Sequence, residues 1–189
     1  MAEKIYLMMN KPAGYVCSAA SDSHKTVYQL LTPELQQLVQ GAKRGERLHT
    51  IGRLDADTTG LLLFTNDGKF SYGITASGGT SKTYLAILKN PVPHDLQTSY
   101  ITRAAQGLIL PPEKKAPEQK AAPAQISFID ETTCRITVIE GKFHEVRRIF
   151  RALGNEVVEL KRVAIGKLEL PSELAPGEYI KFSPEQILF

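Results

Sequence analysis

The chain has 189 residues and a formal net charge of +3 at neutral pH, with 42% hydrophobic and 23% charged residues. This length suits one domain or two small lobes, and the composition is ordinary for a soluble globular protein. No apolar run approaches the ~20 residues of a membrane helix, and the first residues lack the apolar core of a signal peptide. Two isolated cysteines, Cys17 and Cys134, and four histidines without metal-ligand spacing favour a reducing, cytoplasmic setting without metal or cofactor.

Short β-rich segments bounded by Gly, Pro, Asn or Asp run through the whole chain, with a few helical patterns between them. In chain order we expect strands at 5–10 and 14–19, a helix at 33–40, a buried strand at 61–64 closed by a turn at 66–68, a strand at 82–88, a helix at 94–106, an exposed Pro- and Lys-rich loop at 110–125, a hairpin of 126–130 and 133–140, a helix at 143–153, strands at 157–160, 163–170 and 179–182, and a terminal turn of helix from Ser183. Because the strands mostly follow one another through short turns, we predict an α+β fold with a mixed, mainly antiparallel sheet.

The stretch IGRLDADTTG places Arg53 and two carboxylates at the entrance of the buried strand. Asp57, before Thr-Thr-Gly, is typical of a carboxylate that caps a turn. Asp55 follows an apolar residue, so we expect it to be partly buried, where it needs a cation or several donors to stay charged. An ionised aspartate in a cleft can act as a nucleophile or base, although a structural ion pair produces the same pattern.

The predicted helix at 143–153 is amphipathic and basic. Its apolar stripe consists of Phe143, Val146, Phe150 and Leu153, with Ile149 at the margin, and the opposite side carries His144, Arg147, Arg148 and Arg151. Residues 140–167 hold seven Lys or Arg against four Glu, so this segment alone carries the net +3. Such a face can be a solvated surface, can pair with a buried carboxylate, or can bind phosphate, for which Arg148 and Arg151 are candidates.

Several motifs now point to one family. GRLDADTTGLLLFTNDG resembles the signature loop of pseudouridine synthases of the RsuA/RluB/RluE/RluF family. MNKPAGYVCS resembles the opening strand-turn-strand of that family, KTYLAIL its Lys-x-Tyr strand, and EGKFHEVRRIFRALGNEVVELKRVAIGKLEL its C-terminal motif. These blocks occur in the right order over almost the whole chain, and LAPGEY near the end also fits. Within the family the chain looks most like the RsuA branch, which modifies a uridine in small-subunit ribosomal RNA.

The resemblance implies a pseudouridine synthase fold with a central catalytic cleft, and isomerisation of a specific uridine in ribosomal RNA, expected to be the 16S rRNA, without a cofactor. By similarity, Asp55 is the catalytic residue, which attacks the nucleotide or abstracts a sugar proton. Arg53 would help displace the target base from its stack, and Tyr84 would stack on that base. Arg147 would pair with Asp55 and hold it charged and oriented.

Two departures from the family concern substrate choice. Relatives usually carry a small S4-type RNA-binding domain before the catalytic unit, whereas this chain begins at the catalytic unit. We therefore expect residues 1–189 to form a single catalytic domain, possibly of two lobes, without an N-terminal S4 domain, as a natural short form or a trimmed one. The stretch 71–81 contains a Gly-Gly pair and no Arg, Lys or His, which suggests a mobile loop with few phosphate contacts.

The expected partner is ribosomal RNA or a ribosomal subunit assembly intermediate, bound by a monomer away from any membrane. Three alternatives stay open: a non-catalytic RNA-binding assembly factor, the same chemistry on large-subunit rRNA, and a small-molecule nucleosidase. Asp55 beside Arg53 argues against a pure RNA binder, because a carboxylate that faces phosphate weakens such binding. An open basic face argues against the nucleosidase, which needs a closed pocket.

Overall fold

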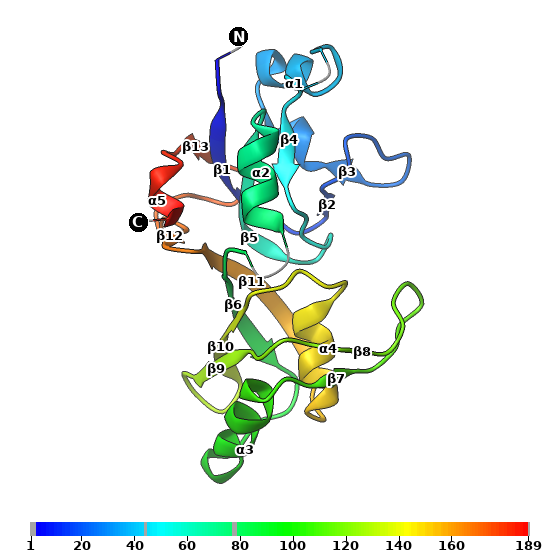
Figure 1. Cartoon of the computed structure of the whole chain (residues 1–189), viewed down its shortest axis with the longest axis vertical. Coiled ribbons are helices and arrows are strands. Elements are labelled where there is room, and N and C mark those ends of the chain that lie inside the picture. Colours follow the sequence, from blue (N-terminus) through cyan, green and yellow to red (C-terminus); the bar gives the residue numbers. More distant parts are fainter. Residues whose placement is uncertain (1–2, 44, 77–78, 189) are drawn as a thin grey trace. The chain divides into compact units, whose positions relative to one another are not determined.

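The computed structural model describes residues 3–43, 45–76 and 79–188. The chain divides into two compact units, of which unit 1 comprises Met1–Ala76 and Arg162–Phe189, and unit 2 comprises Ser77–Lys161. Strands dominate, and most of them pair antiparallel (Figure 1). The α+β class with a mainly antiparallel sheet, predicted from the order of segments, is therefore confirmed. Within the described ranges no helix has the length and apolar character that a membrane crossing requires.

Unit 1 is built around antiparallel strands from both ends of the chain. Its elements are β1 (Tyr6–Lys11), β2 (Tyr15–Val16), β3 (Lys25–Thr26), a 3-10 turn (Val27–Leu30), α1 (Pro33–Gln40), β4 (His49–Ile51), β5 (Thr59–Thr65), α2 (Gly68–Thr75), β12 (Leu168–Glu169), β13 (Tyr179–Lys181) and α5 (Glu185–Leu188). β1 lies between β13 and β5, and β4 pairs with β5 (Figure 1). β2 and β3 form a short parallel pair. α1 begins with Thr32 as N-cap and Pro33 as first helical residue, as predicted.

β5 forms the centre of the unit 1 core. Its consecutive residues Leu61, Leu62, Leu63 and Phe64 are all fully buried. A strand whose consecutive side chains are all buried is covered on both faces, which explains its continuous apolar sequence instead of an alternating one. The buried strand predicted at 61–64 is thus confirmed, and it fixes the end of the loop that precedes it.

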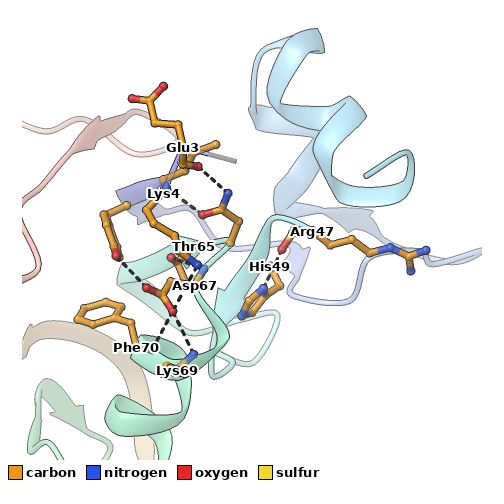
Figure 2. Close-up of polar contacts among 11 residues, drawn as sticks. Glu3, Lys4, Arg47, His49, Thr65, Asp67, Lys69 and Phe70 are labelled. Carbon is orange, nitrogen blue, oxygen red and sulfur yellow. Dashed lines mark hydrogen bonds and ion pairs between the residues drawn. The ribbon is translucent and has the colours of Figure 1, made fainter. Parts of the chain in front are cut away.

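The segment after β5 is helical, which corrects the expectation of a turn leading into a mobile stretch. Asp67 is the N-cap of α2, and its Oδ1 accepts hydrogen bonds from the amides of Lys69 and Phe70 at 3.1 and 3.3 Å (Figure 2). The Tyr6 hydroxyl donates to Oδ2 at 3.0 Å. Burial alone would raise the pKa of Asp67, but these donors and the charge of Lys4 lower it. An aspartate that satisfies the first helical amides starts a helix, and here the helix reaches Thr75. Of the predicted mobile stretch, residues 77 and 78 lie outside the described residues.

In unit 2, the strands β6, β10 and β9 pair antiparallel in that order, and helices pack against them. Its elements are β6 (Lys82–Leu88), α3 (His94–Ala105), β7 (Ile109–Leu110), β8 (Gln119–Lys120), β9 (Gln125–Phe128), β10 (Thr133–Val138) and α4 (Glu145–Ala152). β11 (Val157–Ile165) contains the boundary between the units in the sequence. The core of unit 2 joins apolar residues of the sheet, α3 and α4, among them Ile136, Ala104 and Phe150. The predicted strand at 82–88, the helix at 94–106 and the hairpin are confirmed.

The segment predicted as an exposed loop at 110–125 is largely ordered by pairing. β7 and β8 pair antiparallel, with Ile109 opposite Lys120. Leu110, Ala121 and Ala124 are buried in the unit 2 core. The prediction of a loop was wrong because a Pro-, Lys- and Ala-rich segment shows no hydrophobic periodicity. Pairs of very short strands need only a few residues each and leave no such periodicity. Residues 109–120, here called the arm, run beside α4, and their connecting turn projects beyond that helix (Figure 1).

Candidate active site

The loop 52–58 connects β4 to β5 and carries the residues that the signature motif singled out. Gly52 has a φ of +68°, a left-handed conformation that favours glycine and turns the chain out of β4. Arg53 and Asp57 are exposed, whereas Asp55 is partly buried. The expected partial burial of Asp55 is confirmed, and its neighbour Leu54 is buried.

A fully buried lysine anchors the backbone of this loop. Lys11, the last residue of β1, has no exposed surface. Its Nζ donates to the carbonyl oxygens of Pro12, Asp55, Ala56 and Thr58 at 3.1, 3.0, 3.2 and 2.8 Å. Burial lowers the pKa of Lys11, while the nearby Cys17, Asp57 and Asp55 act in the opposite direction. An ammonium group surrounded by carbonyl oxygens replaces its lost hydration with fixed dipoles, and it ties the loop to β1.

Three further contacts hold the same loop. The Thr58 amide donates to the Asp55 carbonyl oxygen at 3.1 Å, and the Gly14 amide donates to the Ala56 carbonyl oxygen at 2.7 Å. The buried Cys17 Sγ accepts from the Leu54 amide and donates to its carbonyl oxygen, both at 3.4 Å. The backbone on either side of Asp55 is therefore fixed before any ligand arrives. A carboxylate on such a loop is held in position without reorganisation, which is what catalysis by a charged group needs.

In unit 2, Tyr84 lies on β6 opposite Ile136 of β10. Its side chain is partly buried and packs against the unit 2 core. Part of the ring thus belongs to the core, and the rest is accessible. Both interpretations of Tyr84, as a core aromatic and as a stacking platform, are compatible with this position.

Arg147 lies on α4 and is partly buried. Its Nη1 donates to the carbonyl oxygen of Val157 at 3.1 Å. This bond fixes one side of the guanidinium to the strand that follows the helix. Asp55 belongs to unit 1 and Arg147 to unit 2, and their pairing stays a prediction.

The structure corrects the position of Arg148. The helical pattern placed it on an outward basic face, but Arg148 is fully buried. Its Nε, Nη1 and Nη2 donate to the carbonyl oxygens of Pro111, Phe143 and Pro117 at 2.9, 3.3 and 2.6 Å. The arm covers the side of α4 that the pattern left open. Arg148 therefore fastens the arm, and the prediction that it contacts RNA phosphates is wrong.

Arg151 does reach the surface, with 47% of its side chain exposed. It forms an ion pair with Glu113 of the arm, and His144 Nδ1 lies 2.9 Å from the other oxygen of that carboxylate. Burial alone would raise the pKa of Glu113, but the hydrogen bonds and charges of Arg151 and His144 lower it. His144 has a φ of +48°, a left-handed conformation that is strained for a side chain other than glycine. The arm and the start of α4 are thus held together by charged contacts.

Glu145 is a second charged side chain of this helix that the structure removes from solvent. It is buried, at 6% exposure, as the first residue of α4. Burial first, and then the charge of Glu140, raise the pKa of Glu145 to about 7. Glu140 itself pairs with Lys142 and accepts a hydrogen bond from the Ala122 amide at 2.8 Å. Near neutral pH, Glu145 is therefore partly protonated.

Comparison with known proteins identifies the family. The model of the RNA pseudouridylate synthase family matches residues 5–152. The chain belongs to this family. It is 42% identical over 183 residues to ribosomal small subunit pseudouridine synthase A of Pasteurella multocida (strain Pm70), covering 96% of this chain and 72% of the relative. The same identity and coverage are found for the enzyme of that name from Escherichia coli (strain K12).

A solved structure described as a pseudouridylate synthase superposes on all of this chain and 74% of that one, with a TM-score of 0.83 and 39% identity. The chain is therefore an RNA pseudouridine synthase, as the motifs predicted. The span that the family model matches contains the loop of Asp55, the strand of Tyr84 and the whole of α4.

Sequence reasoning missed two residues that shape this synthase. Lys11 follows the predicted strand at 5–10 and was assigned no role, because its four carbonyl partners are brought to it only by the fold. Glu113 was assigned to an exposed loop. No local pattern identifies Glu113, because its partners Arg151 and His144 are more than 30 residues away in the sequence.

Proposed function

We propose that this synthase converts a uridine of small-subunit ribosomal RNA into pseudouridine, with Asp55 as its catalytic residue. The observation that carries the role of Asp55 is the anchored loop: a partly buried carboxylate whose own backbone carbonyl is held by the buried Lys11. The target RNA is supported by the relatives at 42% identity, which are named for the small ribosomal subunit.

The reaction is an isomerisation in which atoms and electrons balance within the nucleotide. The bond between N1 of uracil and C1′ of the sugar breaks, the base rotates, and a bond forms between C5 and C1′. The proton on C5 leaves, and N1 gains one. Asp55 starts this sequence either by attack on the nucleotide or by removal of a sugar proton, and an ionised carboxylate suits both routes.

Three other residues support this reaction in our proposal. Arg53, exposed on the same loop, displaces the target base from its stack. Tyr84 offers the accessible part of its ring to the base. Arg147 pairs with Asp55 and keeps it ionised. The substrate is the RNA or a small-subunit assembly intermediate, and we place a monomeric enzyme in the cytoplasm, where such RNA is made.

Replacement of one carboxylate oxygen of Asp55 by an amide nitrogen tests the role of this residue. Asp55→Asn keeps the shape of the side chain but removes its charge, so tritium release from RNA labelled at uracil C5 should be lost. Asp57→Asn is the matched control, because it makes the same change at an exposed position of the same loop. Release by Asp55→Asn within about tenfold of wild type would refute a catalytic role, since loss of such a charged group costs far more.

A further inference from the structure

The arm ends in a tight turn that presents two lysines. The amide of Glu113 donates to the carbonyl oxygen of Ala116 at 2.8 Å, and the Ala116 amide donates back to the Glu113 carbonyl oxygen at 3.0 Å. This reciprocal pair closes a two-residue hairpin turn whose central residues are Lys114 and Lys115. Both lysines are exposed, and neither forms an ion pair within the part of the chain that the structure describes.

The turn is fixed on α4 at two levels. Nearer its base, the buried Arg148 holds the two sides of the arm together, through the carbonyl oxygens of Pro111 and Pro117. At the turn itself, the Glu113 carboxylate lies between His144 and Arg151, two helical turns apart on α4. A solvated basic loop needs no such fixation to keep a protein soluble. Fixation is useful when the lysines must meet a partner in one place, because ordering them beforehand reduces the entropy lost on binding.

The chemistry of this surface fits RNA phosphate. Lysine is a compact, strongly hydrated charge that binds phosphate without a demand for bidentate geometry. Lys114 directly follows Glu113, which pairs with the half-exposed guanidinium of Arg151, so the turn brings its two lysines to the same end of the arm as that guanidinium. Glu113, their neighbour in the sequence, already forms an ion pair with Arg151. A polyanion that approaches the turn therefore meets two lysines and a half-exposed arginine, against one carboxylate of the arm without an ion pair in the described part of the chain, the exposed Glu118.

We propose that the arm is an RNA-contacting element of this synthase, in which Lys114 and Lys115 bind the phosphate backbone of the substrate RNA and Glu113 positions them. This inference rests on the proposed function, since it names how that substrate is held. Glu113 itself does not touch the RNA and acts only through the turn.

The first test removes the two charges. In a fluorescence titration with a short labelled RNA stem-loop, Lys114→Ala/Lys115→Ala should bind about tenfold more weakly and reduce the slope of log K against log salt by about 1.5. The control Lys69→Ala/Lys181→Ala removes two exposed lysines of unit 1 and changes the net charge equally. An equal loss in both double variants, or no loss in the first, overturns the proposal. So does an effect seen only with small-subunit particles and not with the stem-loop, which would indicate a protein partner.

The second test separates positioning from charge. Glu113→Gln makes the protein more positive by one, so simple electrostatics predicts tighter RNA binding. If Glu113 positions the turn, binding should instead weaken, and trypsin should cleave at Lys114 and Lys115 faster than in wild type. Tighter binding would refute the positioning role. Tritium release from ribosomal RNA by the wild-type enzyme tests the proposed function separately. If the wild type releases tritium and the arm variant binds RNA as tightly as the wild type, the function stands and the role of the arm is refuted. If the wild type releases no tritium, the proposed function is refuted.

Discussion

Lys11 shows how a single buried charge can organise a loop. Its ammonium donates to four carbonyl oxygens, of which those of Asp55, Ala56 and Thr58 belong to the loop 52–58. Each hydrogen bond from a charged donor contributes roughly 1.5–3 kcal/mol, which offsets part of the desolvation of the ammonium. Stability of unit 1 and placement of the Asp55 loop are therefore coupled through one residue.

Arg147 is predicted to act on Asp55 and not on the RNA backbone. Arg147→Met removes the positive charge, and the pKa of Asp55 should rise because desolvation favours the neutral acid once the opposing charge is gone. Single-turnover tritium release should fall by about three orders of magnitude, with RNA affinity nearly unchanged. Arg147→Lys keeps the charge but loses the two-pronged geometry, so it should retain part of the activity. Loss of affinity with normal turnover in Arg147→Met would contradict this role.

Among the helices and strands, local sequence patterns predicted the type and position of most elements but not which other parts of the chain pack against them. β5, α3 and the β9–β10 hairpin follow from apolar runs, helical spacing and turn residues, which are local properties. The outward face assigned to α4 was wrong for Arg148 because the arm covers it, and that arm has no periodicity of its own. α2 was missed although Asp67 is a good N-cap, since Asn66-Asp67-Gly68 suggested a turn and the Gly-Gly pair further on a mobile loop. For the site, the motif located Asp55, but its anchor Lys11 depends on a contact 44 residues away in the sequence.

Glu145, at the start of α4, should make the free energy of unfolding fall as the pH rises, the opposite of the usual effect of a carboxylate. The raised pKa of Glu145, about 7 against an ordinary 4.5, means that the native state keeps a proton that the unfolded state has already released. Stability conferred by that proton is fully present below pH 4.5 and is lost as the pH rises through about 7. The charged groups that face Glu145 are Glu140 and Lys142. Carboxylates with lowered pKa values, such as Glu113, change stability at more acidic pH and leave this window clear.

Chemical unfolding of wild type and Glu145→Gln at several pH values measures this effect. Glutamine resembles the protonated acid and does not titrate, so the free energy of unfolding of Glu145→Gln relative to wild type should increase by about 2 kcal/mol from pH 5 to pH 8. Glu34→Gln, at an exposed position of the first turn of α1, is a suitable control. A constant difference between Glu145→Gln and wild type over this range would show that Glu145 is ionised throughout.

For the molecule as a whole, the net charge calculated from the sequence differs from the charge that lies on the protein surface. The net +3 falls within residues 140–167, yet Arg148 and Arg162 of that segment are buried and bind carbonyl oxygens. They contribute to the cohesion of each unit more than to the field outside. The exposed positive charge of unit 2 comes instead from Arg151, from the lysines of the arm, and from Lys89, Arg103 and Arg135 elsewhere on its surface. Association with RNA depends on that external field.

Mapping of pseudouridines in ribosomal RNA from cells with and without this gene examines the proposed activity in its own setting. Without the gene, a small-subunit uridine position should lose its pseudouridine, and the wild-type gene should restore it while a gene that encodes Asp55→Asn should not. An unchanged small-subunit map, a loss confined to the large-subunit RNA, or full restoration by Asp55→Asn would contradict the proposal.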